Sequence, residues 1–192
     1  MQLHKRDVVA AATSLLDDYG LADLSMRRLA RELEVSPGAL YWHFANKQQL
    51  LGAVADHILA PVAPPTGDWH TRVVACCRQV RNALLSHTDG AELVSASFAA
   101  GQSAVMTDVL GRLTDAAAEA GVPARNAELT ARTVVYYVLG FTVDEQSRRQ
   151  WDAAGAELAD GPTLLTDDPD TRFDFGVRLL LDGILARREQ PA

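Results

Sequence analysis

The chain has 192 residues and a mass of 20.7 kDa, which fits one domain or one domain with a small helical head. Its composition, 48% hydrophobic and 22% charged, is that of a soluble protein with a packed core, and its apolar runs are too short to span a bilayer. The chain does not begin with a signal-peptide pattern. The adjacent Cys76 and Cys77 cannot form a normal disulfide, which excludes a stapled secreted scaffold, so a cytoplasmic protein is expected.

The formal net charge of −7 is distributed unevenly along the chain. Through residue 50, six lysine and arginine residues balance six aspartate and glutamate residues, so the whole negative excess lies in the remainder. Within 25–47, four basic residues outnumber two acidic ones. A neutral to basic head on an acidic body is the asymmetry expected when one end of a protein meets a polyanion.

Every element is expected to be helical, because the sequence shows neither strict apolar–polar alternation nor a hairpin turn flanked by β-branched residues. Gly20 is expected to end the first helix in the left-handed conformation, and Ser25 to cap the second. Ser36 followed by Pro37 is a strong signal for the start of a third helix. The helices expected in this part of the chain span 5–19, 26–33, about 37–43 and about 47–59.

The stretch 61–67 (PVAPPTG) interrupts the helical periodicity and is the best domain boundary in the chain. Beyond it, further helices are expected at 69–87, shortly after the turn at 88–90, at 103–120, at 124–148 and at 169–188, with a loop-like stretch over 152–169. We therefore predict an all-α protein with two domains, a three-helix helix-turn-helix head at 1–60 and a larger helical body at 61–192.

Two short helices joined by three or four residues, the second opening with a cap and a proline, are typical of a helix-turn-helix. The second helix of such a motif lies in the major groove of DNA, where its outward side chains contact base edges or phosphates. Leu40 and Phe44 fit the apolar side of this helix. The residues left to face outward are Gly38, Ala39, Tyr41, Trp42 and His43. The alternative is a plain helical hairpin in which the side chains at 41 and 42 fill a gap in the core.

Residues 24–51 (LSMRRLARELEVSPGALYWHFANKQQLL) resemble the DNA-binding head of TetR-type transcriptional repressors. The shared pattern is a Leu-Ser/Thr start, an Ala-x-x-Leu-x-Val core, a Leu-Tyr-x-His/Tyr-Phe helix and a closing Lys-x-x-Leu. The resemblance continues through the body at 83–93, 140–146 and 173–184, and is weakest across 60–68 and 147–170. It implies a transcription regulator whose partner is a double-stranded DNA operator.

The resemblance also assigns DNA contacts by position. The residues that match the family's contacts to the phosphate backbone are Arg28, Tyr41 and Lys47. The residues that match its base contacts are Arg27, Pro37, Gly38, Ala39, Trp42 and His43. Because Gly38 and Ala39 are small, they offer methyl contact or close approach but no bidentate hydrogen bond to a base. The operator is therefore expected to differ from that of tetracycline-responsive family members.

The last helix and the helix at 124–148 carry more apolar surface than one core needs. In the last helix, apolar residues cover one side, while Leu179 lies elsewhere together with Gly176 and Gly183. Such a helix is either fully buried or shared with a partner, and the residues alone leave both possibilities open. The resemblance implies a homodimer through a four-helix bundle. Its two-fold symmetry would place two heads in successive major grooves of a palindrome.

A small organic effector is likewise implied by the resemblance, and apolar segments with interspersed polar residues suit such a ligand. The residues predicted to bind it are Phe98, Gln102, Met106, Tyr136, Tyr137 and Phe141. The alternative for each is a plain core position. No metal or other cofactor is expected. In tetracycline-binding members of the family, a histidine that binds the drug's magnesium ion stands where this chain has Val94, and Asp144 without that imidazole is a poor metal site.

The sequence contains no recognisable catalytic arrangement. Its five histidines are scattered, and none pairs with a serine, cysteine or acid at the spacing of a nucleophile, metal site or phosphate loop, so no enzyme is expected. Cys76 and Cys77 are expected to fill the core, with a redox sensor as the alternative.

We thus expect a homodimeric repressor that a small molecule releases from a palindromic operator, with the helix at 47–59 transmitting the change. The alternatives are an activator or a co-ligand-dependent regulator of the same fold, and a small-molecule binding protein without DNA function.

Overall fold

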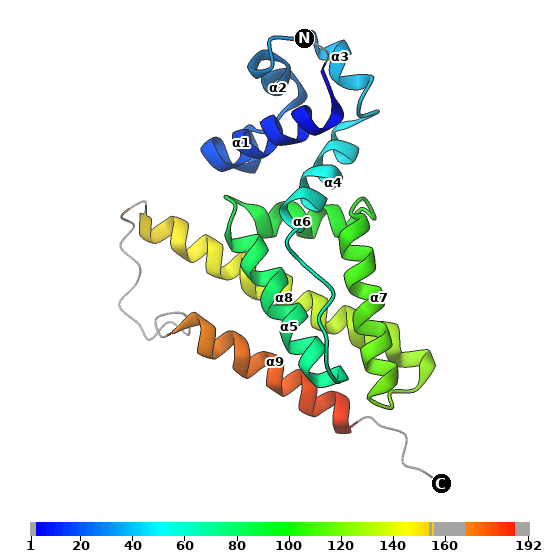
Figure 1. The fold of residues 1–192 in the computed structure, drawn as a ribbon. Helices are drawn as coiled ribbons and strands as arrows, with labels where there is room; N and C mark the ends of the chain where they lie inside the picture. Colours follow the sequence, from blue (N-terminus) through cyan, green and yellow to red (C-terminus); the bar gives the residue numbers. More distant parts are fainter. Residues whose placement is uncertain (1–2, 154, 156–167, 187–192) are drawn as a thin grey trace. The chain divides into compact units, whose positions relative to one another are not determined.

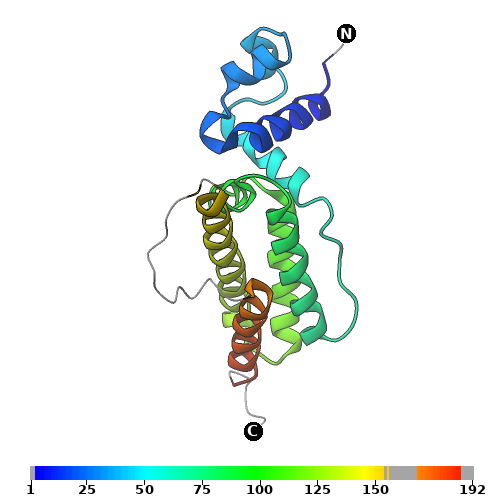
Figure 2. The same cartoon turned by 90° about the vertical axis from the view of Figure 1, so that its left-hand side faces the viewer.

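The computed structural model describes residues 3–153, 155 and 168–186, and all secondary structure in these residues is helical (Figures 1 and 2). The helices are α1 (Lys5–Asp23), α2 (Met26–Glu32), α3 (Pro37–Tyr41), α4 (Lys47–Ile58), α5 (Trp69–Leu85), α6 (Gly90–Ala99), α7 (Ala104–Glu119), α8 (Ala124–Ala153) and α9 (Pro169–Ala186). The all-α prediction is confirmed. α8 continues five residues past the predicted end at 148. Most of the loop predicted at 152–169, and the last two residues predicted for the final helix, lie outside the described residues.

The chain divides into two compact units. The first combines the segments Met1–Pro61 and Asn82–Thr107, and the second combines Val62–Arg81 with the chain from Asp108 onward. α5 and α7 therefore contribute residues to both units. The first segment ends one residue after the predicted boundary at 60, and the division into a DNA-binding head and a ligand-binding body stays a prediction.

No single helix among the described residues is both long and apolar enough to cross a membrane. By length and composition alone, the bent pair formed by α6 and α7 could do so.

The first unit is built around the apolar sides of α1 to α4. Gly20, with a φ of +78°, interrupts α1 in the left-handed conformation that the sequence predicted, and the chain then adds a short turn to Asp23. Asp89 accepts a hydrogen bond from the backbone N–H of Leu21 at 2.8 Å. The side chains that form this core include Val8, Leu15, Leu16, Leu29, Leu40, Phe44, Leu50 and Val54.

The second unit packs α5, α7, α8 and α9 together, and α8 and α9 lie side by side in both views (Figures 1 and 2). Cys76 and Cys77 of α5 are buried in it, as predicted. Burial raises the pKa of both thiols, that of Cys76 to about 11. Because the thiolate is the reactive form, this environment disfavours the redox-sensor alternative.

An ionic cluster connects α5, α8 and α9 inside the second unit. Arg81, 5% exposed, donates two hydrogen bonds to the buried carboxylate of Glu145, at 2.8 and 3.0 Å, and a third to Asp170 at 2.7 Å. Arg149 donates to the same Glu145 at 2.6 Å, and the Arg81 guanidinium lies 4.9 Å from the centroid of the Phe173 ring. Burial alone would lower the pKa of Arg81. The hydrogen bonds to Glu145 and Asp170 have the larger combined effect, so the pKa lies above its usual value.

We expect Glu145→Gln to lower the free energy of unfolding by about 3 kcal/mol, because it leaves the buried Arg81 without its bidentate partner. Glu128→Gln is the matched control. Glu128 pairs with Arg132 on the exposed surface of α8, and its loss is expected to cost at most about 0.5 kcal/mol. Urea unfolding at one fixed protein concentration measures both variants. Equal destabilisation by the two substitutions would contradict the structural role given to the cluster.

Candidate DNA-binding interface

Side-chain caps and a tight turn fix α2 and the chain that follows it. Ser25 Oγ accepts a hydrogen bond from the backbone N–H of Arg28 at 3.2 Å, which begins α2. After α2, Glu34 adopts a φ of +52°, and the backbone N–H of Val35 donates to the carbonyl of Ala30 at 2.9 Å. A left-handed residue with this hydrogen bond ends a helix and reverses the chain direction, so α3 can begin a few residues later.

α3 is a single short turn of helix with a defined start. Ser36 Oγ accepts a hydrogen bond from the backbone N–H of Ala39 at 3.3 Å, and Pro37 occupies the first helical position, as predicted. α3 ends at Tyr41 rather than near residue 43. The N–H groups of His43 and Phe44 both donate to the Leu40 carbonyl, at 2.9 Å each. The bond from His43 spans three residues instead of four, so the last turn is tighter than an α-helix and the helix ends there.

One side of α3 and of the turn after it is buried and apolar, and the other side exposes aromatic side chains. Leu40 and Phe44 are fully buried, as predicted. Tyr41 is 52% exposed and Trp42 is 90% exposed, so the alternative in which they fill a gap in the core is wrong. Of the other predicted base contacts, Pro37 and Gly38 are exposed, whereas Ala39 and His43 are half-buried. Exposed aromatic side chains of this size are typical of a binding surface.

The predicted basic contacts flank α3 on two helices. Arg27 is exposed on α2, while Arg28 is held against α1 by an ion pair with Asp23 at 2.6 Å and by the Tyr19 ring, 3.8 Å from the guanidinium carbon to the ring centroid. Lys47 is the first residue of α4. All nine predicted DNA contacts therefore lie on or between α2, α3 and the start of α4 in the first unit. Their contact with DNA stays a prediction.

α4 is hydrogen-bonded to the turn before α7, within the first unit. Asp56 of α4 accepts hydrogen bonds from Ser103 Oγ at 2.6 Å and from the backbone N–H of Val105 at 3.1 Å. Gly52 lies so close to this turn that a Cβ there would clash with the Gln102 carbonyl oxygen. The turn at 102–105 is thus in direct contact with the helix that follows α3.

α1 has its own connection to the turn between α5 and α6. The carboxylate of Asp17 accepts a hydrogen bond from the backbone N–H of Thr88 at 3.0 Å and lies 3.0 Å from His87 Nδ1. In return, Thr88 Oγ1 donates to the Asp17 carbonyl at 3.0 Å. With the Asp89–Leu21 bond, these contacts attach the end of α1 to residues 87–89.

The residues predicted to bind an effector are divided between the two units. Tyr137 and Phe141 come together in an aromatic cluster with Phe173, with ring centroids 5.3–5.8 Å apart, and Tyr137 Oη donates to the Phe173 carbonyl at 3.0 Å. Burial raises the pKa of Tyr137, so its hydroxyl remains a donor at pH 7. Both side chains are half-buried in this cluster, whereas Tyr136 is exposed. In the first unit, Met106 is buried, Phe98 half-buried and Gln102 exposed. Ligand binding by these six residues stays a prediction.

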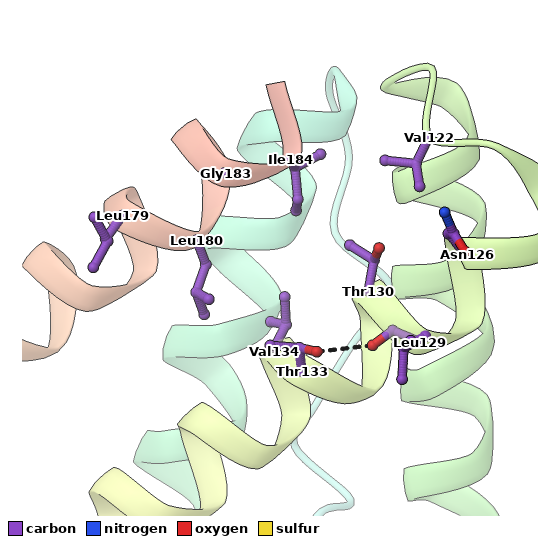
Figure 3. Close-up of a pocket in the computed structure, with 10 residues that line it drawn as sticks. All are labelled: Val122, Asn126, Leu129, Thr130, Thr133, Val134, Leu179, Leu180, Gly183 and Ile184. Atoms are coloured by element: carbon purple, nitrogen blue, oxygen red, sulfur yellow. Dashed lines mark hydrogen bonds between the residues drawn. The ribbon is translucent and has the colours of Figure 1, made fainter. Parts of the chain in front are cut away.

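A groove of about 440 Å³ runs between α8 and α9 (Figure 3). Its lining is mainly apolar, with Leu129 and Val134 on α8 and Leu179 and Ile184 on α9. None of the six residues predicted to bind an effector lines it. Leu129 is 64% exposed and Leu179 is 62% exposed, so the apolar walls of this groove are open to solvent.

Candidate metal ligands do not gather in the part of the chain that the structure describes. No group of three or more His, Cys, Asp or Glu side chains lies close enough there to hold an ion. Val94 is buried and Asp144 is exposed.

Comparison with known proteins agrees with this geometry over nearly the whole chain. A family model described as "Bacterial regulatory proteins, tetR family" matches residues 8–54, and one described as "Tetracyclin repressor-like, C-terminal domain" matches residues 60–188. The class A tetracycline repressor of transposon 1721 from Escherichia coli is 30% identical over 203 residues, which cover 97% of this chain and 93% of that repressor.

Two solved structures of BioQ are more similar still. Mycobacterium smegmatis BioQ is 61% identical, with a TM-score of 0.90, and the match covers 97% of this chain and 99% of that one. BioQ with its natural double-stranded DNA operator is 58% identical, with a TM-score of 0.84, covering 96% of this chain and 99% of that one. The fold and the exposed short helix therefore define a helix-turn-helix transcription regulator. The chain belongs to the TetR family.

We expect the double substitution Tyr41→Ala with Lys47→Ala to lower affinity for an operator duplex by about 100-fold, because two contacts to phosphates are lost. The free energy of unfolding is expected to change by less than about 0.5 kcal/mol, since Tyr41 is exposed. Fluorescence anisotropy with duplexes selected from random DNA measures the affinity.

The matched control is Arg78→Ala, which removes an exposed, positively charged side chain from α5 and should leave DNA binding unchanged. Normal DNA binding by the double variant would show that the assigned face is wrong.

Proposed function

We propose that this chain is a cytoplasmic transcriptional repressor that binds a palindromic double-stranded DNA operator as a homodimer and is released by a small organic molecule. The observation that carries the proposal is the exposure of Tyr41, the last residue of α3, and of Trp42, which follows it. α3 is a five-residue helix whose start is capped and whose other side is buried. The BioQ structure with its operator supports DNA as the partner, because its 58% identity extends over nearly the whole of both chains.

A single copy of α3 presents too few side chains to select a long DNA site. Five residues of helix contact a few base pairs, and each good base contact contributes about 1–3 kcal/mol of discrimination. Two copies related by a two-fold axis place two such helices in successive major grooves, roughly 34–36 Å apart. The proposed palindrome follows from this symmetry.

The exposed apolar faces of α8 and α9 support the homodimer. Besides Leu129 and Leu179, Tyr136 of α8 and Phe175 of α9 are more than half exposed, and the groove between the helices is open to receive side chains. Exposed large apolar side chains beside such a groove are typical of an interaction site, and a second copy would cover them with the same surface. Four helices, two from each copy, would then form one bundle.

The contacts of α4 offer a route from an effector to the DNA-binding helices. Any displacement of the turn at 102–105 acts on α4 through Asp56 and through the close approach of Gly52. Only five residues separate the end of α3 at Tyr41 from the start of α4 at Lys47. A displacement of α4 therefore changes the direction of α3. A coupling of about 1–3 kcal/mol between the two sites would change operator affinity 5- to 150-fold.

We expect Leu179→Glu to convert the dimer to a monomer, because it buries a charge without a partner in the proposed bundle. Operator affinity should fall about 100-fold or more, since the two heads no longer bind as one molecule. Sedimentation velocity measures the assembly, and fluorescence anisotropy measures DNA binding.

Trp42→Glu is the matched control, an equally drastic change at an exposed apolar residue of the first unit. It should abolish DNA binding while the protein stays dimeric. A Leu179→Glu variant that remains dimeric would refute the proposed interface, and a Trp42→Glu variant that binds the operator normally would refute the role of α3.

A further inference from the structure

Tyr19 of α1 is a large aromatic side chain that is neither in the core of the first unit nor among the predicted DNA contacts. It is 54% exposed. Its ring lies against Arg28 of α2, with the guanidinium carbon 3.8 Å from the ring centroid. Arg28 is one of the three residues predicted to contact phosphates, so Tyr19 packs against a predicted DNA contact without being one itself.

The interruption of α1 at Gly20 brings a second side chain of α1 to the same guanidinium. Gly20 is left-handed, with a φ of +78°, so the chain changes direction between Tyr19 and Asp23. The carboxylate of Asp23 accepts a hydrogen bond from Arg28 Nη1 at 2.6 Å. The backbone after Gly20 is itself anchored, because the N–H of Leu21 donates to Asp89 at 2.8 Å. The ring and the carboxylate therefore reach Arg28 from a fixed stretch of backbone.

These two contacts leave most of the guanidinium available. An arginine side chain carries five N–H donors in a planar fork. In the part of the chain that the structure describes, the Arg28 side chain donates only to Asp23, and a contact with the face of a ring uses no N–H group. The Nε and Nη2 groups remain for another acceptor. A neighbouring pair of N–H groups of this kind binds a phosphate with two parallel hydrogen bonds.

Of the two contacts, the ring is the one that favours phosphate binding. A mobile arginine loses part of its binding energy because the side chain must be ordered when the phosphate binds. The Tyr19 ring restricts the guanidinium in advance and adds no negative charge. Asp23 is a weaker restraint, because its side chain is 57% exposed and solvent screens the ion pair. Its charge also opposes the approach of a phosphate.

We infer that Tyr19 is a positioning residue for DNA binding, whose ring holds the Arg28 guanidinium in place while Nε and Nη2 donate to a phosphate. This inference rests on the proposed function, because it requires that Arg28 meets DNA. It gives a role to a side chain of α1, a helix that contributes none of the nine predicted contacts.

The ring contact is tested without DNA, by NMR of the arginine Nε–H groups in the full-length protein. The Arg28 signal is assigned by its disappearance in Arg28→Gln. We expect the ring current of Tyr19 to shift this signal upfield, and we expect the shift to be kept in Tyr19→Phe and lost in Tyr19→Leu. An identical Arg28 signal in the unmodified protein and in Tyr19→Leu would overturn the inference.

The positioning role is tested by fluorescence anisotropy with a duplex selected from random DNA. Tyr19→Leu should weaken binding by about tenfold, because ordering a mobile arginine costs about threefold in each of two half-sites. Tyr19→Phe keeps the ring and should bind as the unmodified protein does. In the Arg28→Gln background, Tyr19→Leu should cause no further loss. A purely structural Tyr19 would weaken binding in both backgrounds, and that result would overturn the inference.

Asp23→Asn is the control for the ion pair. It removes a negative charge beside the phosphate and keeps the ring, so the duplex should bind at least as tightly as to the unmodified protein. A loss as large as that in Tyr19→Leu would overturn the inference, because the ion pair would then hold Arg28. If the unmodified protein binds no duplex, the proposed function fails. Duplex binding that Tyr19→Leu leaves unchanged overturns this inference alone.

Discussion

A five-residue helix has no stability of its own, so everything that α3 presents depends on what fixes its ends and its buried side. Ser36 and Pro37 set its first turn, and Asn46 caps the helix that follows by accepting a hydrogen bond from the backbone at 2.9 Å. Leu40 and Phe44 anchor the apolar side in the core of the first unit. Because the start and the apolar side of α3 are fixed, Tyr41 and Trp42 are held outward although neither is buried. A rigid short helix is what base contacts in a major groove require, because loosely held side chains would lose much of their binding energy to ordering.

Three carboxylates of α1 and α4 accept hydrogen bonds within the first unit. These bonds affect both the charge around α3 and the contacts that hold α1 and α4. Asp23 is paired with Arg28, Asp17 accepts from the Thr88 backbone N–H, and Asp56 accepts from residues 103–105. Asp17 and Asp23 belong to residues 1–50, whose formal charge is zero. Because both carboxylates are bonded within the first unit, Arg27 and Lys47 can face a polyanion. The same hydrogen bonds tie α1 and α4 to the turns on either side of α6. Any change in those turns therefore reaches the helices that hold α3.

Local signals in the sequence predicted the helices well, whereas contacts between distant residues were beyond it. The caps at Ser25 and Ser36 and the left-handed Gly20 follow from short-range backbone chemistry, and the structure confirms each. The sequence predicts that α3 ends near residue 43 rather than at Tyr41, because no particular residue type marks the tight turn that ends it. Glu34 in the left-handed conformation was likewise not predicted, since glutamate rarely adopts it. The Arg81–Glu145 pair joins residues 64 positions apart and the Asp56–Ser103 bond joins residues 47 apart, and a single sequence does not reveal such pairs. For the candidate sites, helical spacing located the exposed face of α3, but it did not show that Tyr137 and Phe141 pack into an aromatic cluster.

The decisive experiment is selection of bound duplexes from a random DNA library by the purified protein at moderate salt. We expect enrichment of a palindrome whose half-sites are about one helical turn apart, as two copies of α3 on a two-fold axis require. Binding of that palindrome should also weaken steeply as salt rises, because phosphate contacts release counterions. Failure of a folded, dimeric protein to enrich any palindrome would contradict the claim that this chain recognises an operator on its own.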